Sequence, residues 1–356
     1  MKYTHFYTIS QSIRNECSIF AAKYIRKMTK LTLFFTIFIS LFLAMLPHAI
    51  WFICWLIGKC FHYSLPYAPF GWTAVALVLC VWLLMGYGYW VGRWQTETNR
   101  VTVTSSTLPS TFDGYSIVHI SDFHLSTFDG HPEHVQRLVD TINALQPDLI
   151  CFTGDLVSIA TEEARPYTDI LKQLQAKDGV VSILGNHDFL IYNRSFADAA
   201  QQKEEVERLA AYQRDELHWT LLRNEHKVIR RGTDSLTILG VDNIHGNGQG
   251  FSTIDYGNLS QAMTGTGGYR ILLTHDPSHW EAEVLHHTDI PLTLSGHTHS
   301  AQIRMFGWNP ASWMFRQSWG KYTVDGQTIY VNAGLGCTLP VRLNCPSEIT
   351  LITLQK

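Results

Sequence analysis

Five short polar blocks recur along this chain in a fixed order, and each contains side chains that bind divalent metals. The blocks are Asp122-Phe123-His124, Gly154-Asp155, Gly185-Asn186-His187-Asp188, Thr274-His275-Asp276 and Gly296-His297-Thr298-His299. Carboxylates, imidazoles and an amide oxygen form the mixed donor set that Mn, Fe and Zn accept. The chemistry that these residues suggest is hydrolysis at a metal centre.

The ligand-type residues divide into two metal sites. Two neighbouring cations need a bridging carboxylate and several neutral ligands, so that the total charge still allows an anionic phosphate to bind. Asp155 is the expected bridge, because it lies between the other blocks and follows a glycine that permits a tight loop. The expected ligands are Asp122, His124 and His299 for one metal, and Asn186, His275 and His297 for the other. A hydroxide bridging the metals would be the nucleophile.

His187 directly follows an expected ligand but is not needed as one. A cationic imidazole beside the metals would stabilise charge on the phosphoryl oxygens or protonate the departing alkoxide. We expect Asp188 to orient this ring and therefore assign both residues to catalysis. Ser121, Thr153 and Asp276 are either partners of the ligands or ordinary loop-capping residues.

Each block follows an apolar stretch with the length of a buried strand. Strands are predicted at 117–120, 149–152, 180–184, 228–229, 236–239, 271–273, 292–294, 328–332 and 349–354, and helices at 131–146, 167–174 and 197–217. The first half alternates strand and helix, as in a parallel α/β sheet, where ligands collect beyond the carboxyl ends of the strands. The sequence thus predicts that the blocks meet at one edge.

The first hundred residues carry most of the excess apolar character of this 356-residue chain, which is 46% apolar and 16% charged. Residues 31–57 and 71–92 contain no charged side chain. Each run is long enough to cross a hydrocarbon core, which needs about 20 residues. Pro47 predicts either a kinked, tilted first span or a shorter span followed by an interfacial turn. A cleaved signal peptide fits less well, because the run is longer than a typical signal core.

These features predict four parts of the chain. They are a basic N-terminal segment at 1–30, a membrane anchor at 31–93 with two spans, a linker rich in Thr and Ser at 94–112, and a hydrolytic domain at 113–356. Lysines and arginines precede the first span and follow the second, with only Lys59 between them, which favours both ends in the cytoplasm. A start at Met28 would weaken this argument, and a single span would place the domain on the other side.

Composition also argues against some partners and compartments. A net charge of −3 gives no support for a nucleic-acid surface, which needs a cationic patch. Seven cysteines without a CxxC pair are consistent with a reducing compartment. No obligate protein partner is evident.

With its five blocks in order, the chain resembles the calcineurin-like metallophosphoesterase superfamily, whose pattern runs D-x-H, G-D, G-N-H-D/E, H and G-H-x-H. The resemblance spans about 115–354 and is closest in look to the membrane-associated bacterial branch of YkuE-like and YaeI-like phosphoesterases and some UDP-2,3-diacylglucosamine pyrophosphatases. It implies a four-layer αββα sandwich, two divalent metal ions (Mn, Fe or Zn) and a bacterial inner (cytoplasmic) membrane location. Members often have Gly-Gly-Gln where this chain has Ser300-Ala301-Gln302, which predicts a slightly altered pocket wall.

The substrate is less defined than the chemistry. An anchor confines the enzyme to a plane, so a phosphoester or pyrophosphate of a lipid or lipid precursor is the first choice. The alternatives are a tethered phosphodiesterase for soluble nucleotides and a non-catalytic metal-binding scaffold. The aromatic residues between 305 and 319 would either contact lipid or pack in the core. Arg304, Arg316 and Arg342 would either bind phosphate oxygens or be solvated, and His245, His279, His286 and His287 stay unassigned.

Overall fold

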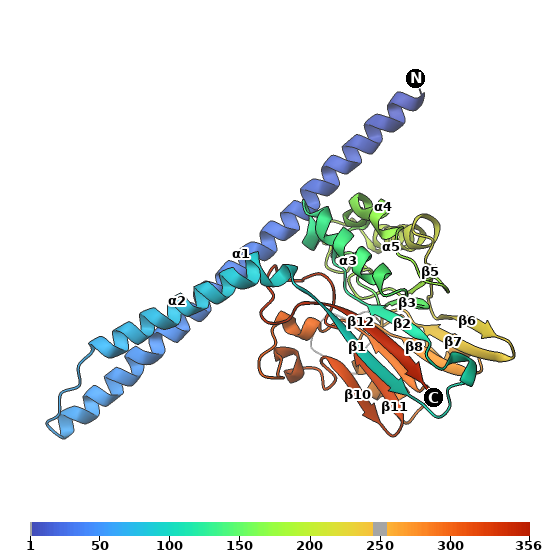
Figure 1. The fold of residues 1–356 in the computed structure, drawn as a ribbon. Coiled ribbons are helices and arrows are strands. Elements are labelled where there is room, and N and C mark those ends of the chain that lie inside the picture. Colours follow the sequence, from blue (N-terminus) through green and yellow to red (C-terminus); the bar gives the residue numbers. More distant parts are fainter. Residues whose placement is uncertain (1, 245–254) are drawn as a thin grey trace.

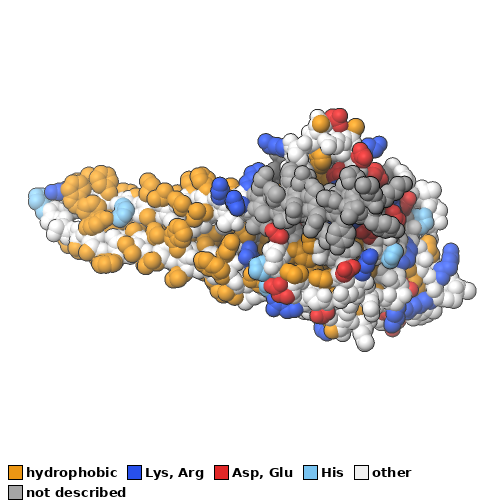
Figure 2. Space-filling model, turned by 90° about the horizontal axis from the view of Figure 1, so that it is seen from above, with side chains coloured by type: hydrophobic (Ala, Val, Ile, Leu, Met, Phe, Trp, Pro, Cys, Tyr) orange, Lys and Arg blue, Asp and Glu red, His pale blue; other side chains and the backbone are white. Residues whose placement is uncertain are grey.

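Two long helices project from an α/β domain in the computed structural model, which describes residues 2–244 and 255–356 (Figure 1). Helix α1 (Lys2–Cys60) continues through Pro47 as one helix, and α2 (Ala68–Trp90) packs beside it. The stretches Arg26–Cys60 and Ala68–Trp94 are long and apolar enough to cross a membrane. Figure 2 shows apolar side chains along the outside of this helix pair. Because an outward-facing apolar surface of this length is unfavourable in water, the pair is a candidate membrane anchor.

The segment after the helices differs from the predicted linker. Gly92–Trp94 forms a 3-10 turn, and Thr96–Thr104 forms strand β1, which pairs in parallel with β12 (Ser347–Gln355) at the edge of a sheet. Side chains of β1 alternate between exposed and partly buried. A polar edge strand of this kind has the composition of a linker, which explains the incorrect prediction.

Two six-stranded sheets form the domain, ordered β1-β12-β2-β3-β4-β5 and β10-β11-β9-β8-β7-β6. The remaining strands of the first sheet are β2 (Ser116–Ile120), β3 (Leu149–Phe152), β4 (Val180–Ser182) and β5 (Thr220–Leu221). Those of the second are β6 (Glu225–Arg231), β7 (Asp234–Gly240), β8 (Tyr269–Leu273), β9 (Leu292–Ser295), β10 (Gly320–Val324) and β11 (Gln327–Val331). Strands β2, β3 and β4 are parallel, as are β7, β8 and β9, so their carboxyl ends share an edge within each sheet.

Three apolar layers confirm the predicted four-layer αββα sandwich. Helices α3 (Pro132–Ala144), α4 (Thr168–Leu171) and α5 (Ala199–Ala211) belong to the first sheet's side, where Val139 and Leu209 join the strand core. Ile117 and Ile271 lie in the layer between the sheets. Helix α6 (Leu259–Met263) and the π-helical turn Trp280–Val284 contribute to the third layer.

Two α-helices are shorter than predicted from the sequence. The 167–174 prediction corresponds to a 3-10 segment, Thr161–Tyr167, followed by the single turn of α4. The 197–217 prediction corresponds to α5 followed by a π-helical turn, Tyr212–Glu216. Neither difference changes the positions of the five polar blocks, because these blocks follow strands and not helices.

Candidate metal centre and cleft

The five polar blocks meet where the parallel strands end. Asp122 and His124 follow β2, Asp155 follows β3, and Asn186 follows β4; the loops after β8 and β9 provide His275, His297 and His299. The structure therefore brings together all seven side chains that the sequence singled out as ligands. The loops after the carboxyl ends of the parallel strands in the two sheets provide this convergence.

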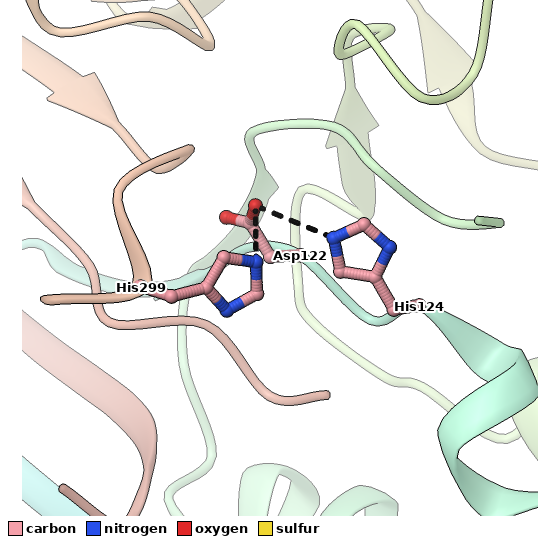
Figure 3. A group of neighbouring side chains, drawn as sticks. All are labelled: Asp122, His124 and His299. Atoms are coloured by element: carbon pink, nitrogen blue, oxygen red, sulfur yellow. Dashed lines mark ion pairs between the residues drawn. The ribbon is translucent and has the colours of Figure 1, made fainter. Parts of the chain in front are cut away.

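One group of side chains surrounds Asp122. His299 Nε2 lies 3.2 Å from Asp122 Oδ1, and His124 Nε2 lies 3.9 Å from the same oxygen (Figure 3). His124 Nε2 is also 3.6 Å from Asp155 Oδ2. Three nitrogen and oxygen donors thus face one small volume, with Asp155 at its border.

A second group surrounds Asn186. Its Oδ1 lies 3.0 Å from His275 Nε2 and 2.9 Å from His297 Nδ1, and its amide nitrogen donates to the Tyr192 hydroxyl. His275 Nε2 is 3.2 Å from Asp155 Oδ2. Asp155 Oδ2 consequently lies between the two groups, which is the position that a bridging carboxylate requires. Sequence reasoning missed Tyr192, because a loop tyrosine gives no signal by spacing.

Unpaired buried atoms test whether these residues fit a metal. Among the described residues, Asp122 Oδ1, His124 Nε2 and His299 Nε2 are buried without a hydrogen-bond partner. Leaving such atoms unpaired costs about 1–3 kcal/mol each, unless a ligand satisfies them. Three converging donors of the correct type therefore fit a divalent cation.

The protonation states support the same fit. Burial opposes ionisation of Asp122 and Asp155, but neighbouring histidines, His299 for the first and His275 for the second, outweigh burial and lower both pKa values. Burial lowers the pKa of His124, so this imidazole is neutral. Burial also favours neutral His275, but Asp155 outweighs it and raises the pKa of His275 to about 10. A cation bound here would replace that proton.

Backbone geometry at the site is unusual. Asp122, His124, Asp155, His297 and His299 all have positive φ, between 42° and 72°. Non-glycine residues rarely occupy this region, and such strain tends to concentrate at functional sites. The strands fix these loops strongly enough to hold five metal-type residues in a costly conformation.

Gly185 is the point where side-chain volume would disturb the site. A Cβ atom at this position would overlap Asp155 Oδ1 and come within 2.7 Å of the His275 ring. We expect Gly185→Ala to weaken metal binding about 10- to 100-fold, because both ligands must move. Metal content after dialysis against fixed free Mn²⁺ measures this. Gly267→Ala, which meets nothing within 4 Å, should bind metal as the parent does; equal binding by both variants would contradict the prediction.

His187 is held by a backbone carbonyl. Its Nδ1 donates to the Ser158 carbonyl at 2.8 Å, which leaves Nε2 as the free ring nitrogen. The ring also packs against those of His124 and Tyr192, with centroids 4.6 and 4.3 Å away. Burial lowers the pKa of His187, although Asp155 works against this. This shift favours the neutral ring, so Nε2 must first take up a proton before it can act as the donor that the sequence suggested.

Asp188 has a different role from the orientation of His187 that we expected. Its carboxylate accepts hydrogen bonds from the backbone N–H groups of Asp155, Leu156, Val157 and Gly185, at 2.7 to 3.2 Å. It thereby joins the loop after β3 to the loop after β4. Asp188 is a positioning residue for Asp155, while Ser158 positions His187.

Thr153, Asp276 and Ser121, the possible partners of the ligands, make different contacts. Thr153 contributes its carbonyl, which accepts from His275 Nδ1 at 2.7 Å and directs Nε2 toward Asp155. Asp276 caps its own loop by accepting from Ser278, and its Oδ2 also lies 3.9 Å from Nε2 of the expected ligand His297. The hydroxyl of Ser121 is buried without a hydrogen-bond partner among the described residues.

The three arginines considered for phosphate binding lie elsewhere. Arg342 is fully buried and donates to backbone carbonyls, including those of Ala333 and Gly334. Arg304 pairs with Glu97 at 2.6 Å, and Arg316 is an exposed partner of Glu281. None of the three lines the metal cleft.

The cleft over the metal-type residues has a volume of roughly 1070 Å³ and includes a wall from helix α1. Tyr24, Lys27, Met28 and Leu31 of α1 line it, close to where the candidate span begins. The cationic residues in its lining are Lys27 and Arg194. Sequence reasoning missed both as site residues, since nothing in the residue pattern indicates that the continuous helix α1 runs past the site.

The backbone conformation of Ser300 and Ala301 explains why similar proteins often have glycine at these two positions. Ser300 and Ala301 have φ values of 53° and 50°, in the region that favours glycine. Gln302 donates to the carbonyls of Leu339 and Val341 and accepts from Thr338. Since Thr338 and Leu339 line the cleft, Gln302 fixes one of its walls.

Histidines outside the blocks do not join the site. His279 is buried and bonded to Thr274 Oγ1 at 2.9 Å, and His286 is exposed beside Asp325. His287 contributes a turn N–H to the Val284 carbonyl. His245 lies outside the described residues.

Comparison with known proteins identifies the family. The model of the calcineurin-like phosphoesterase family matches residues 115–301. The chain is 33% identical to the uncharacterized metallophosphoesterase YkuE of Bacillus subtilis, over 76% of this chain and 90% of that protein. It is 30% identical to a zebrafish (Danio rerio) transmembrane protein with a metallophosphoesterase domain, over 80% of this chain and 63% of the relative.

A third relative is named for its substrate. The UDP-2,3-diacylglucosamine pyrophosphatase LpxG of Chlamydia trachomatis is 28% identical over 79% of this chain and 94% of that protein. The YkuE-like branch suggested by the motifs is confirmed. The chain belongs to the calcineurin-like phosphoesterase family, whose members are metal-dependent hydrolases of phosphoric esters.

Proposed function

We propose that this protein is a membrane-anchored phosphohydrolase with two divalent metals, and that it hydrolyses a phosphoester or pyrophosphate of a lipid or lipid precursor. The observation that carries this proposal is the shared cleft: residues of α1 at the start of the candidate span line the same cavity as the expected metal ligands. A substrate whose tail stays in the bilayer would reach the site along this wall. The pyrophosphatase activity named for the LpxG relative is a concrete version.

The two groups of donors would hold the metals. Asp122, His124 and His299 would bind one cation, and Asn186, His275 and His297 the other, with Asp155 shared between them. Bound cations would supply neutralisation of phosphate charge and activation of the attacking water. Mn, Fe and Zn all accept this donor set.

The protein's own side chains would position the substrate and handle a proton. The Nε2 atom of His187, which lines the cleft, would take up a proton from water and then donate it to the departing oxygen, returning the ring to its neutral form. Lys27 and Arg194 would attract further phosphate charge. Ile159, Ile191 and Leu339 give the cleft an apolar component suited to a lipid tail.

The proposed topology places both chain ends in the cytoplasm. Basic residues flank the helix pair on the side of the domain, and Lys59 is the basic residue near the far turn. The domain would then act on the cytoplasmic face of a bacterial inner membrane, on the lipid leaflet that the cleft adjoins.

Lys27 offers a direct test of the α1 wall. We expect Lys27→Ala to lower kcat/KM for an anionic lipid substrate roughly three- to tenfold, as about 1 kcal/mol of charge-assisted hydrogen bonding is lost. Lys30→Ala is the matched control, because Lys30 is also an exposed lysine of α1 but does not line the cleft. Equal losses in the two variants would remove α1 from the binding site.

The substrate class is tested by comparing lipid and soluble phosphoesters. Purified full-length protein in detergent with Mn²⁺ should hydrolyse a lipid pyrophosphate or phospholipid with a higher kcat/KM than a soluble nucleotide diester. Faster hydrolysis of the soluble diester would instead favour a tethered nucleotide phosphodiesterase.

A further inference from the structure

Large apolar side chains are exposed on one loop of the domain, residues 305–314. Phe306 is fully exposed and Trp313 is 79% exposed, and the other exposed members are Met305, Trp308 and Met314. Elsewhere in the described part of the domain, exposed large apolar residues occur singly, as at Val228 and Val324. A concentration of this kind marks an interaction surface. Of the aromatic residues predicted either to contact lipid or to pack in the core, Phe306, Trp308 and Trp313 are thus exposed, whereas Phe315 is buried.

The loop is an ordered structure. Met305 and Trp308 exchange two backbone hydrogen bonds of 2.8 and 2.9 Å, and the rings of Trp308 and Trp313 lie 5.1 Å apart. Asn309 Nδ2 donates to Ser318 Oγ at 3.0 Å and ties the loop to its own base. The apolar side chains are therefore held outward by the fold.

The loop begins beside the candidate membrane helices. Ile303 bridges to Leu343, and the Arg304 amide donates to the Leu343 carbonyl at 3.0 Å. A Cβ at Gly88 would lie 2.7 Å from a Leu343 side-chain atom, so this segment packs directly on α2 within its apolar stretch. Figure 1 shows the orange-brown chain of this region on the side of the domain from which α1 and α2 project.

The composition of the loop matches a bilayer interface. Residues 305–315 contain no charged side chain, and the exposed Arg316 follows them, whereas Arg304, which precedes them, is buried and paired with Glu97. Tryptophan near an exposed basic residue is typical of segments at the boundary between lipid tails and headgroups. A soluble partner protein would explain the exposure equally well, but not the packing of the loop's base against α2.

We propose that residues 305–314 insert into the bilayer interface beside the helix pair and join the membrane to the metal cleft. The loop continues directly into the cleft, because Met314 and Phe315 line it and the Phe315 ring lies 5.3 Å from that of His297. The inserted loop and α1 would form the two sides of a passage for a lipid. The passage rests on the proposed lipid function, whereas the insertion itself does not.

An environment-sensitive probe tests insertion without any turnover. The full-length chain, with the four cysteines before residue 94 replaced, would carry Phe306→Cys labelled with the fluorophore NBD, in phosphatidylcholine vesicles containing phosphatidylglycerol. The remaining Cys151, Cys337 and Cys345 are buried. The matched control is Val228→Cys on β6, which lies at the far end of the domain from the helix pair (Figure 1).

We expect blue-shifted NBD emission at position 306, with several-fold stronger quenching by doxyl-labelled lipid than at position 228. Equal, water-like emission and equal iodide quenching at both positions would overturn the insertion and leave a soluble partner as the occupant. Metal content equal to that of the parent verifies that each labelled variant is folded. Because the probe reports no hydrolysis, insertion without lipid turnover would reject the proposed substrate and not the interfacial loop.

Discussion

Replacing Asp155 by alanine should remove metal from the centre and lower turnover about 10³-fold or more, because several kcal/mol of charge stabilisation depend on the bound cations. Asp155 Oδ2 lies within 3.6 Å of His124 Nε2 and 3.2 Å of His275 Nε2, so its loss disturbs both groups of donors. Its Oδ1 also accepts from the His187 amide at 2.8 Å. Metal analysis and phosphate release measure the two effects on the same sample.

The matched control for this prediction is Asp140→Ala, which changes the net charge equally on the exposed surface of α3. That variant should bind metal and turn over as the parent does. An Asp155→Ala protein with both metals and parental activity would show that the shared-carboxylate assignment is wrong.

Replacing His187 by alanine should lower kcat by about 10²- to 10⁴-fold, the usual contribution of a positioned proton donor. Metal content should stay near that of the parent, because His187 is bonded to the Ser158 carbonyl and the seven ligand-type residues remain. Steady-state kinetics and metal analysis together separate these outcomes. A large loss of metal would instead make His187 a ligand.

Comparing two leaving groups tests whether His187 donates a proton. A p-nitrophenolate departs without protonation, whereas an alkoxide needs a proton, so the loss in His187→Ala should be much smaller for the aryl ester. His286→Ala, which removes an exposed histidine, should match the parent with both esters. Equal losses for the two leaving groups would assign His187 to charge stabilisation and not to proton transfer.

The positions of the ligand-type residues could be predicted because parallel strands end at a common edge. Asp122, Asp155 and Asn186 each follow a short apolar stretch, and β2, β3 and β4 indeed lie side by side. Strand order could not be predicted in this way. Nothing near Thr96–Thr104 indicates that this segment pairs with the last strand of the chain. Its polar composition therefore led us to predict a linker and not an edge strand.

Side-chain partners were harder to predict than positions. Asp188 is adjacent to His187 in sequence, yet its carboxylate faces backbone N–H groups of the preceding loop, since a tight turn directs neighbouring side chains apart. Arg342 is buried among carbonyls, where sequence offers no indication of burial for an arginine. The α1 wall of the cleft depends on packing between segments about 100 or more residues apart, which no local pattern encodes.

A metal titration measures whether two metals bound at this site are required for phosphoester hydrolysis. Full-length protein stripped with EDTA would be titrated with Mn²⁺, and hydrolysis of bis(p-nitrophenyl) phosphate followed at each addition. We expect no hydrolysis without metal and a rise to a plateau at two equivalents of Mn²⁺ per chain. Hydrolysis that persists in EDTA, or two bound equivalents with no phosphoester hydrolysed, would show that this site is not a two-metal phosphoesterase centre.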